Sequence, residues 1–273
     1  MPTGSSTRAL PTYFICHGGG PWHVMGGHWA TAHAGLRAAL QTMSAEMQAL
    51  KPRAVLLVSA HWEATEFRVQ GQAKPGLLFD YGGFPPEAYC LRYAARGAPA
   101  IAAQLQTLLR EAGHSCELES RRGYDHGAFV PMAVLWPDAD VPLLQLSLKA
   151  GLDAGTHLQV GRILASLRHA GILIIASGSS WHNLQQLGEP AHLPSQEWDG
   201  WLDRALTACT GAARSRALLD WRNAPHARLA HPREEHLLPL MVAVGAAEAE
   251  AGHCNYRESR VFGGPTLSGY RFG

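Results

Sequence analysis

The feature that most constrains the fold is a repeated plan in which an uncharged apolar run ends in a small, flexible turn and a histidine. The clearest example is residues 172–184, where an Ile- and Leu-rich run leads through Ser-Gly-Ser-Ser and a tryptophan to His182. An apolar run of this length is typical of a buried strand. Its small residues let backbone approach a ligand closely. Because ligands of open α/β sheets bind beyond the carboxyl ends of the strands, His182 is a candidate functional residue.

The same plan occurs twice more, and two other histidines lie in related settings. Residues 11–16 run into His17 and a Gly-Gly-Gly-Pro turn, and residues 54–59 lead to His61. His126 precedes an apolar segment, and His236 follows a proline and two acidic residues, the signature of a helix start. We expect that helix to begin near residue 232, with His236 in its first turns and pointing inward.

Helical and strand patterns alternate along the chain, which predicts an α/β fold with a central mixed, mostly parallel sheet flanked by helices. No linker or charge run divides the 273 residues, so we expect one domain spanning 1–273. Further strands are expected at 66–70 and 141–147, and helices at 32–50, 99–112, 156–169, 198–209 and 213–221. The aromatic, Gly- and Pro-rich stretch 79–86 is expected to be a loop that forms a lid or pocket wall.

Charge and composition narrow the classes of partner. With 23 Lys and Arg against 22 Asp and Glu, the net charge of +1 argues against a nucleic-acid partner. No apolar run approaches the roughly 20 residues of a membrane helix, and the N-terminus lacks the apolar core of a signal peptide. The five cysteines are scattered, which is typical of a reducing compartment. We therefore expect a cytoplasmic protein without a membrane partner; a homo-oligomer is left open.

Histidine is over-represented, with 15 copies. Seven lie in helical or loop contexts without a partner pattern and are assigned to the surface: His33, His114, His157, His169, His192, His226 and His253. The four that adjoin strand ends or a helix start can form a metal site or be unrelated polar residues: His17, His61, His182 and His236. Imidazole suits zinc, iron and copper; catalytic zinc has three protein ligands, and non-haem Fe(II) typically has two histidines and a carboxylate.

Five motifs together resemble, in order and over nearly the whole chain, the extradiol ring-cleavage dioxygenases of the LigB superfamily. The similarity is greatest to the branch of DOPA-4,5-dioxygenase-like proteins. The motifs are His-Gly-Gly-Gly-Pro at 17–21, Ser-Ala-His-Trp at 59–62, Asp-His-Gly at 125–127, Gly-Ser-Ser-Trp-His-Asn-Leu at 178–184 and Glu-His-Leu-Leu-Pro-Leu at 235–240. Gly19 and Trp181 depart from the residues expected of the family, which affects the expected shape of the pocket.

The resemblance implies a non-haem metal held by His17 and His61, with a third ligand from the segment around residue 235. His236 is the favoured third ligand and Glu235 is the alternative. His182 is implied as the general base that deprotonates the substrate, or as a further metal ligand. His126 is implied as an acid/base group or substrate contact beside the metal.

The implied reaction is the opening of a catechol ring, DOPA-like or related, with O₂. Fe(II) is the metal expected for activity, and Zn(II) is the ion that can occupy the site in purified protein. The expected substrate contacts are Trp62, Tyr81, Asn183 and Arg271. A substrate carboxylate has four candidate partners, namely Arg92, Arg121, Arg122 and Arg271. The alternatives are a zinc-dependent hydrolase and a non-catalytic metal-binding protein on the same fold.

Overall fold

The computed structural model describes residues 8–273 and contains one eight-stranded mixed sheet with the strand order β4-β3-β5-β2-β6-β1-β8-β7. The strands are β1 (Thr12–Cys16), β2 (Ala54–Ala64), β3 (Phe67–Gln70), β4 (Cys116–Glu119), β5 (Leu143–Lys149), β6 (Ile172–Gly178), β7 (Gly252–Glu258) and β8 (Leu267–Phe272). The predicted α/β fold with a mixed central sheet is confirmed.

The four central strands, β5, β2, β6 and β1, run parallel to one another. All residues of β1 and β6 are buried, as expected for uncharged strands covered on both faces. Cys16 at the end of β1 lies opposite Gly178 at the end of β6. The turns that follow these two strands therefore leave the sheet at the same edge.

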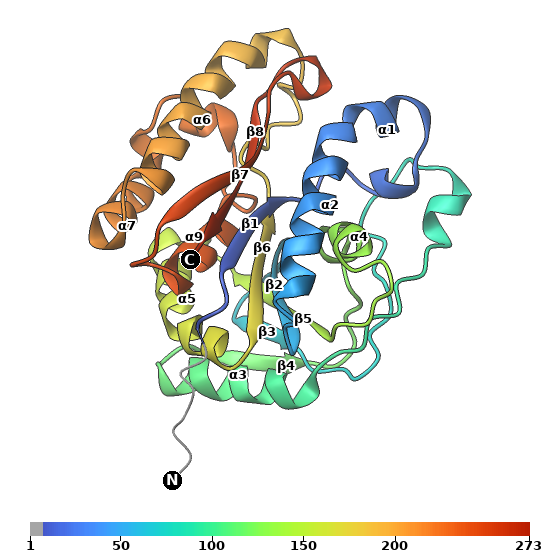
Figure 1. The fold of residues 1–273 in the computed structure, drawn as a ribbon, viewed down its shortest axis with the longest axis vertical. Helices are drawn as coiled ribbons and strands as arrows, with labels where there is room; N and C mark the ends of the chain where they lie inside the picture. The colour runs from blue at the N-terminus through green and yellow to red at the C-terminus, as the bar shows by residue number, and fades with distance from the viewer. Residues whose placement is uncertain (1–7) are drawn as a thin grey trace.

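Helices cover both faces of the sheet (Figure 1). Helices α2 (Ala34–Ala49) and α4 (His126–Leu135) pack on one face, and α3 (Pro99–Glu111), α5 (Ala154–His169) and α9 (Leu238–Ala246) pack on the other, each against its own apolar core. The remaining α-helices are α1 (Gly27–Ala32), α6 (His192–Thr207), α7 (Gly211–Leu219) and α8 (Ala227–Ala230). Short 3-10 helices are η1 (Trp22–Val24), η2 (Pro86–Tyr89), η3 (Glu189–Ala191), η4 (Trp221–Asn223) and η5 (Val261–Gly263). None of the helices between residues 8 and 273 is long and apolar enough to cross a membrane.

Two expected boundaries near the site are wrong. Strand β2 continues to Ala64 through a break in its pairing with β5 between Val58 and Glu63, so His61 lies in an irregular part of the strand and not in its exit loop. The helix expected to begin near residue 232 begins at Leu238. His236 precedes it because its backbone carbonyl accepts a hydrogen bond from the amide of Ser179, at 3.0 Å, instead of entering the helix.

Two histidines assigned to the surface, His33 and His157, are buried. His33 stacks on Trp22, and its Nε2 accepts a hydrogen bond from the amide of Gly19. His157 Nε2 accepts from the amide of Lys149, while its Nδ1 lies 2.7 Å from a backbone carbonyl. Because both ring nitrogens are satisfied in each case, burial of the imidazole carries no unpaired polar atom.

Candidate metal centre and active site

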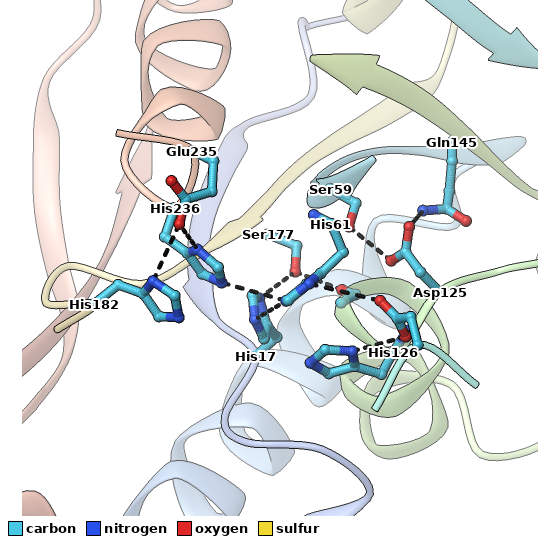
Figure 2. A network of polar contacts seen from close by, with 12 residues as sticks. His17, Ser59, His61, Asp125, His126, Gln145, Ser177, His182, Glu235 and His236 are labelled. Atoms are coloured by element: carbon cyan, nitrogen blue, oxygen red, sulfur yellow. Dashed lines mark hydrogen bonds and ion pairs between the residues drawn. The ribbon is translucent and has the colours of Figure 1, made fainter. Parts of the chain in front are cut away.

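Three histidine Nε2 atoms from distant parts of the chain meet at the carboxyl edge of the central strands. His61 Nε2 lies 3.0 Å from His17 Nε2 and 3.3 Å from His236 Nε2. In Figure 2, dashed lines join the His61 side chain to those of His17 and His236. Two nitrogens bound to one metal at about 2.1 Å, with a ligand angle between about 90° and 110°, are about 3.0–3.4 Å apart. The spacing of these three side chains therefore fits a shared metal ion.

Hydrogen bonding fixes the tautomer of His17. The Ser177 hydroxyl donates to the carbonyl of Gly127 at 2.5 Å, so its oxygen is left as an acceptor for His17 Nδ1 at 3.1 Å. The proton of the imidazole then sits on Nδ1, and Nε2 presents a lone pair. This is the form in which a neutral histidine binds a metal.

The other two histidines are oriented by carboxylates. His236 Nδ1 lies 2.9 Å from Glu235 Oε1, and a carboxylate can only accept, so His236 also carries its proton on Nδ1. His61 Nδ1 faces Asp80 Oδ2 at 3.6 Å, an ion-pair distance that favours the same tautomer. All three Nε2 lone pairs thus point toward one another, an arrangement that a cation stabilises.

Burial keeps these imidazoles neutral. It lowers the pKa of His17 and of His236 well below the usual value, and the neighbouring histidines lower both further. Burial, followed by the charge of His126, lowers the pKa of His61 to about 3. Because a metal binds only the unprotonated nitrogen, these shifts favour metal binding at neutral pH.

His126 opens α4 beside this cluster. Its backbone amide and its Nδ1 both lie within hydrogen-bond distance of Asp80 Oδ1, at 2.9 and 2.8 Å. Burial would raise the pKa of Asp80, but the bonds from His126 outweigh it and the net shift is downward. The rings of His126 and His61 are 3.9 Å apart, and ligand nitrogens of His17, His61 and His126 lie within 4.8 Å of one another. His126 is therefore a neighbour of the candidate centre whose Nε2 is left available.

His182 lies on the other side of the cluster, stacked on His236 with ring centroids 3.3 Å apart. Its Nδ1 faces Glu235 Oε1 at 3.2 Å, so one carboxylate oxygen serves both imidazoles. Burial would raise the pKa of Glu235, but the hydrogen bond from His182 outweighs it and the pKa is lowered. The backbone amide of His182 donates to the carbonyl of Ala230, which fixes the loop after β6.

A buried polar network supports the residues around His61. Asp125 accepts hydrogen bonds from Ser59, Gln145 and Arg122 at 2.7, 2.9 and 3.0 Å. Arg122 also donates to the carbonyl of His61 at 2.9 Å. The network joins β2, β5 and the start of α4. It therefore fixes the backbone of His61 relative to that of His126, the residue after Asp125.

A cavity of about 510 Å³ opens over the histidine cluster, a volume typical of small-molecule sites. His17, His61, His126, His182 and His236 line its floor. Aromatic and aliphatic side chains form most of the walls, namely Trp29, Ala32, Leu36, Trp181, Leu184, Leu187, Tyr256, Val261, Phe262, Pro265 and Leu267. The site therefore combines a polar, histidine-lined floor with apolar walls.

A family model described as the catalytic LigB subunit of aromatic ring-opening dioxygenase matches residues 11–273. The chain belongs to this family. The resemblance that the motifs indicated is thus confirmed.

Curated relatives of the LigB-family chain carry related names. Dioxygenase tasH of Hapsidospora irregularis is 37% identical over 267 residues, covering 90% of this chain and 81% of the relative. The 4,5-DOPA dioxygenase extradiol of Beta vulgaris is 35% identical over 248 residues and 89% of each chain. The 4,5-DOPA dioxygenase extradiol of Escherichia coli (strain K12) is 32% identical over 250 residues, covering 90% of this chain and 88% of the relative.

The fold is shared with a solved structure. The crystal structure of uncharacterized protein JW3007 from Escherichia coli K12 matches with a TM-score of 0.75 and 26% sequence identity. The match covers 97% of this chain and 100% of that chain. The LigB-like architecture expected from the sequence is therefore confirmed.

The residues expected to contact substrate are not brought to the cavity wall. Trp62 packs beneath Arg122, 5.2 Å from its guanidinium carbon, and Asn183 donates to the carbonyl of Leu229. Tyr81 lies near His126, with ring centroids 5.8 Å apart, but does not line the cavity.

The four arginines considered for a substrate carboxylate also lie elsewhere. Arg271 pairs with Glu46 and lies opposite Tyr13 near the start of β1, away from the end that leads to the histidines. Arg122 is engaged with Asp125. Among residues 8–273, no arginine lines the cavity.

Ser177 and Asp80 are positioning residues that sequence reasoning did not identify. Ser177 directly follows the apolar run of β6, and Asp80 lies in the aromatic loop expected to be a pocket wall. Each lies in a stretch that the sequence analysis had marked, but their partners are far away: Ser177 is 160 residues from His17, and Asp80 is 46 residues from His126. The only sequence signal for either residue was a polar side chain within or next to a stretch already expected to lie near the site.

The glycine turn after β1, residues 18–20, forms part of the cavity wall. Gly20 has φ +54°, and an added Cβ would lie 2.5 Å from Phe84 in the aromatic loop. A Cβ on Gly19 would lie 3.3 Å from Trp29. The glycines thus let two aromatic side chains pack directly on the turn that carries His17.

Proposed function

We propose that this protein is a metal-dependent extradiol dioxygenase that opens the ring of a catechol with O₂, with residues 1–273 as one catalytic domain. The observation that carries the proposal is the set of three Nε2 lone pairs directed at one point on the floor of an apolar cavity. Two further histidines beside that point supply acid/base groups. The names of the relatives, dioxygenase and 4,5-DOPA dioxygenase extradiol, agree with this chemistry.

His17, His61 and His236 would hold the metal. His236 is favoured over Glu235 because the Glu235 carboxylate faces the Nδ1 edges of two imidazoles, on the side away from the shared Nε2 point. Three protein ligands is the number typical of catalytic metal sites that keep positions open for substrate. Fe(II) at this point would acidify the catechol hydroxyls and supply electrons for O₂ activation.

His182 would take a proton from the catechol. Its Nδ1 faces Glu235, so its Nε2 can accept, and the carboxylate stabilises the imidazolium that forms. His126, whose Nδ1 is held by Asp80 on the opposite side of His61, would donate from a protonated Nε2 a hydrogen bond or proton to an oxygen of the reacting O₂, and both oxygens stay in the ring-opened product. The apolar walls exclude water around both groups.

The deciding experiment is O₂ uptake by metal-stripped protein reconstituted anaerobically with Fe(II) or Zn(II) and then given a panel of catechols. We expect stoichiometric uptake and a yellow ring-opened product with Fe(II), and none with Zn(II). Anaerobic hydrolysis of an ester or amide by the Zn(II) form would instead favour a hydrolase. Tight metal binding without either reaction would leave a metal-binding protein.

His182→Ala separates the role of base from that of ligand. Loss of a general base lowers turnover by about 10²–10⁴-fold, and the three Nε2 donors remain, so we expect the variant to bind one iron per chain as the wild type does. Iron content is measured by metal analysis and turnover by O₂ uptake. His253→Ala, an exposed histidine on β7, is the matched control and should change neither. Loss of iron from His182→Ala would assign His182 as a ligand.

A further inference from the structure

The walls of the cavity carry no formal charge. Among residues 8–273, no Asp, Glu, Lys or Arg lines it. Arg260 precedes η5, the 3-10 helix that carries Phe262. Its guanidinium forms an ion pair with the Glu189 carboxylate, with an N–O distance of 2.6 Å, and both side chains are more than half exposed. Neither belongs to the cavity wall. Above the histidine floor, a carboxylate on a bound ligand would therefore find no Lys or Arg side chain to pair with.

Four polar side chains that line the cavity outside the histidine floor already form hydrogen bonds within the protein. Tyr256 donates its hydroxyl to Glu258 at 2.8 Å, and Ser179 donates to the carbonyl of Trp181 at 2.6 Å. Cys16 donates to the carbonyl of Ser268. His33 has both nitrogens within hydrogen-bond distance of backbone groups. These groups have no spare donor for a substrate carboxylate.

An aromatic side chain is held over the cavity at a conformational cost. Phe262 has φ 51° and ψ 26°, a left-handed conformation that a bulky residue rarely adopts. Its ring lies 6.3 Å from that of Trp29 and 5.3 Å from that of His33. Such outliers persist where the surrounding structure enforces them and often mark binding sites. Phe262 and Trp29 form an aromatic part of the cavity wall.

The opening of the cavity is also largely apolar. Leu184, two residues after His182, lines the cavity and is 70% exposed. Other polar groups among the described residues that line the cavity include the exposed imidazole of His28, which lies beside Phe262, and the indole N–H of Trp29. An exposed leucine at the mouth of a pocket favours ligands that cover it with apolar surface.

We propose that the site selects catechols whose ring substituent is uncharged and apolar, and discriminates against those that carry a carboxylate or an amino-acid side chain. The proposal rests on the dioxygenase function proposed above, and it separates this chain from relatives named for DOPA. The catechol hydroxyls would face the histidine floor while the substituent packs between Trp29, Phe262 and Leu184. A charged substituent would lose its hydration without gaining a partner.

The test compares 4-propylcatechol with 3-(3,4-dihydroxyphenyl)propionate and DOPA on the Fe(II) protein. We expect kcat/KM for 4-propylcatechol to be at least about tenfold higher than for either charged catechol. The Zn(II) protein gives a second readout by calorimetry, in which 4-propylcatechol should also bind at least about tenfold more tightly.

The outcomes separate this inference from the proposed function. Ring opening at equal or higher kcat/KM with the charged catechols would overturn the substrate preference and leave the dioxygenase standing. Tighter binding of 4-propylcatechol by the Zn(II) protein, without ring opening of any catechol by the Fe(II) protein, would support the preference and overturn the dioxygenase. Absence of binding and of turnover would overturn both.

A charge introduced at the rim gives a matched pair of variants. Leu184→Arg places a cation at the mouth and should raise kcat/KM for the propionate relative to 4-propylcatechol by about tenfold. Leu193→Arg adds the same charge at a residue that is 67% exposed, in α6, and does not line the cavity. It should leave the ratio unchanged. An unchanged ratio in active Leu184→Arg, or equal shifts in both variants, would overturn the inference.

Discussion

In each histidine of the candidate metal centre, the acceptor that faces Nδ1 keeps the ring proton on that nitrogen and so leaves Nε2 unprotonated. His17 meets a hydroxyl, Ser177, whereas His236 meets the Glu235 carboxylate. A carboxylate partner raises the basicity of a metal-bound imidazole more than a neutral acceptor does. His236 is therefore expected to be a stronger donor than His17, although both carry the same ligand atom.

His231 stabilises the loop that carries His182. Its Nε2 donates to the carbonyl of Ser180 at 3.0 Å, and Trp198 Nε1 donates to the same oxygen at 2.6 Å. The ring is fully buried between aromatic side chains, and its Nδ1 has no hydrogen-bond partner. A proton on that nitrogen would be a buried, unpaired charge.

Acid should therefore destabilise the fold through His231. Burial lowers its pKa from 6.5 to about 4. Because the folded value lies below the unfolded value, the stabilisation is complete above about pH 6.5 and is lost as pH falls toward 4. His231→Gln keeps a donor without a titrating ring, so its free energy of unfolding should fall by roughly 2–3 kcal/mol less between pH 7 and pH 4 than that of the wild type. Urea unfolding at each pH measures this. Equal losses in the two proteins would contradict the assignment; His253→Gln is the exposed control.

At the scale of elements, the sequence predicted the covered interior better than the edges. The central strands were anticipated because uncharged apolar runs stand out. Strands β4, β7 and β8 were not anticipated. Strands β4 and β7 lie at the two edges of the sheet and half or more of their residues are not buried, which leaves little apolar alternation. Strand β8 is mostly buried, but its Ser, Gly and Arg residues interrupt any apolar run. The start of α9 was misplaced because Pro232 and its acidic neighbours resemble a helix start but serve tertiary contacts, with Glu234 pairing to Arg222 and Arg228.

Helices α5 and α9 meet through glycine, and this contact positions the segment that carries His236. A Cβ on Gly245 would lie 2.1 Å from the carbonyl oxygen of Leu158 and 3.0 Å from the Cα of Gly161. Gly245→Ala should therefore lower the free energy of unfolding by about 1–3 kcal/mol, the usual cost of overpacking. Gly76→Ala is the control, because a Cβ there meets nothing within 4 Å, and its effect should stay within about 1 kcal/mol. Chemical denaturation measures both; a neutral Gly245→Ala would show that the helices can separate without loss.

For the whole molecule, the limit of sequence reasoning is set by distance along the chain. The candidate ligands were predicted because each histidine follows a local strand or helix signal. Their orientation was not, because it depends on partners such as Ser177, which local patterns cannot assign to His17. The neutral, apolar character of the cavity is likewise a property of side chains from several segments that only the fold brings together.

Because the candidate ligands lie far apart along the chain, we predict that metal binding stabilises the whole fold. His17 lies in the turn after β1, His61 in β2 and His236 in the segment before α9, so an ion bound to all three is lost on unfolding. At a free metal concentration about 100-fold above Kd, binding adds about 2.7 kcal/mol, which for a chain of this length raises Tm by about 5 °C. Differential scanning fluorimetry of protein stripped with a chelator and then reloaded with Zn(II) measures the shift. His236→Ala should lose most of it and His253→Ala should keep it. An equal shift in both variants would place the bound metal elsewhere.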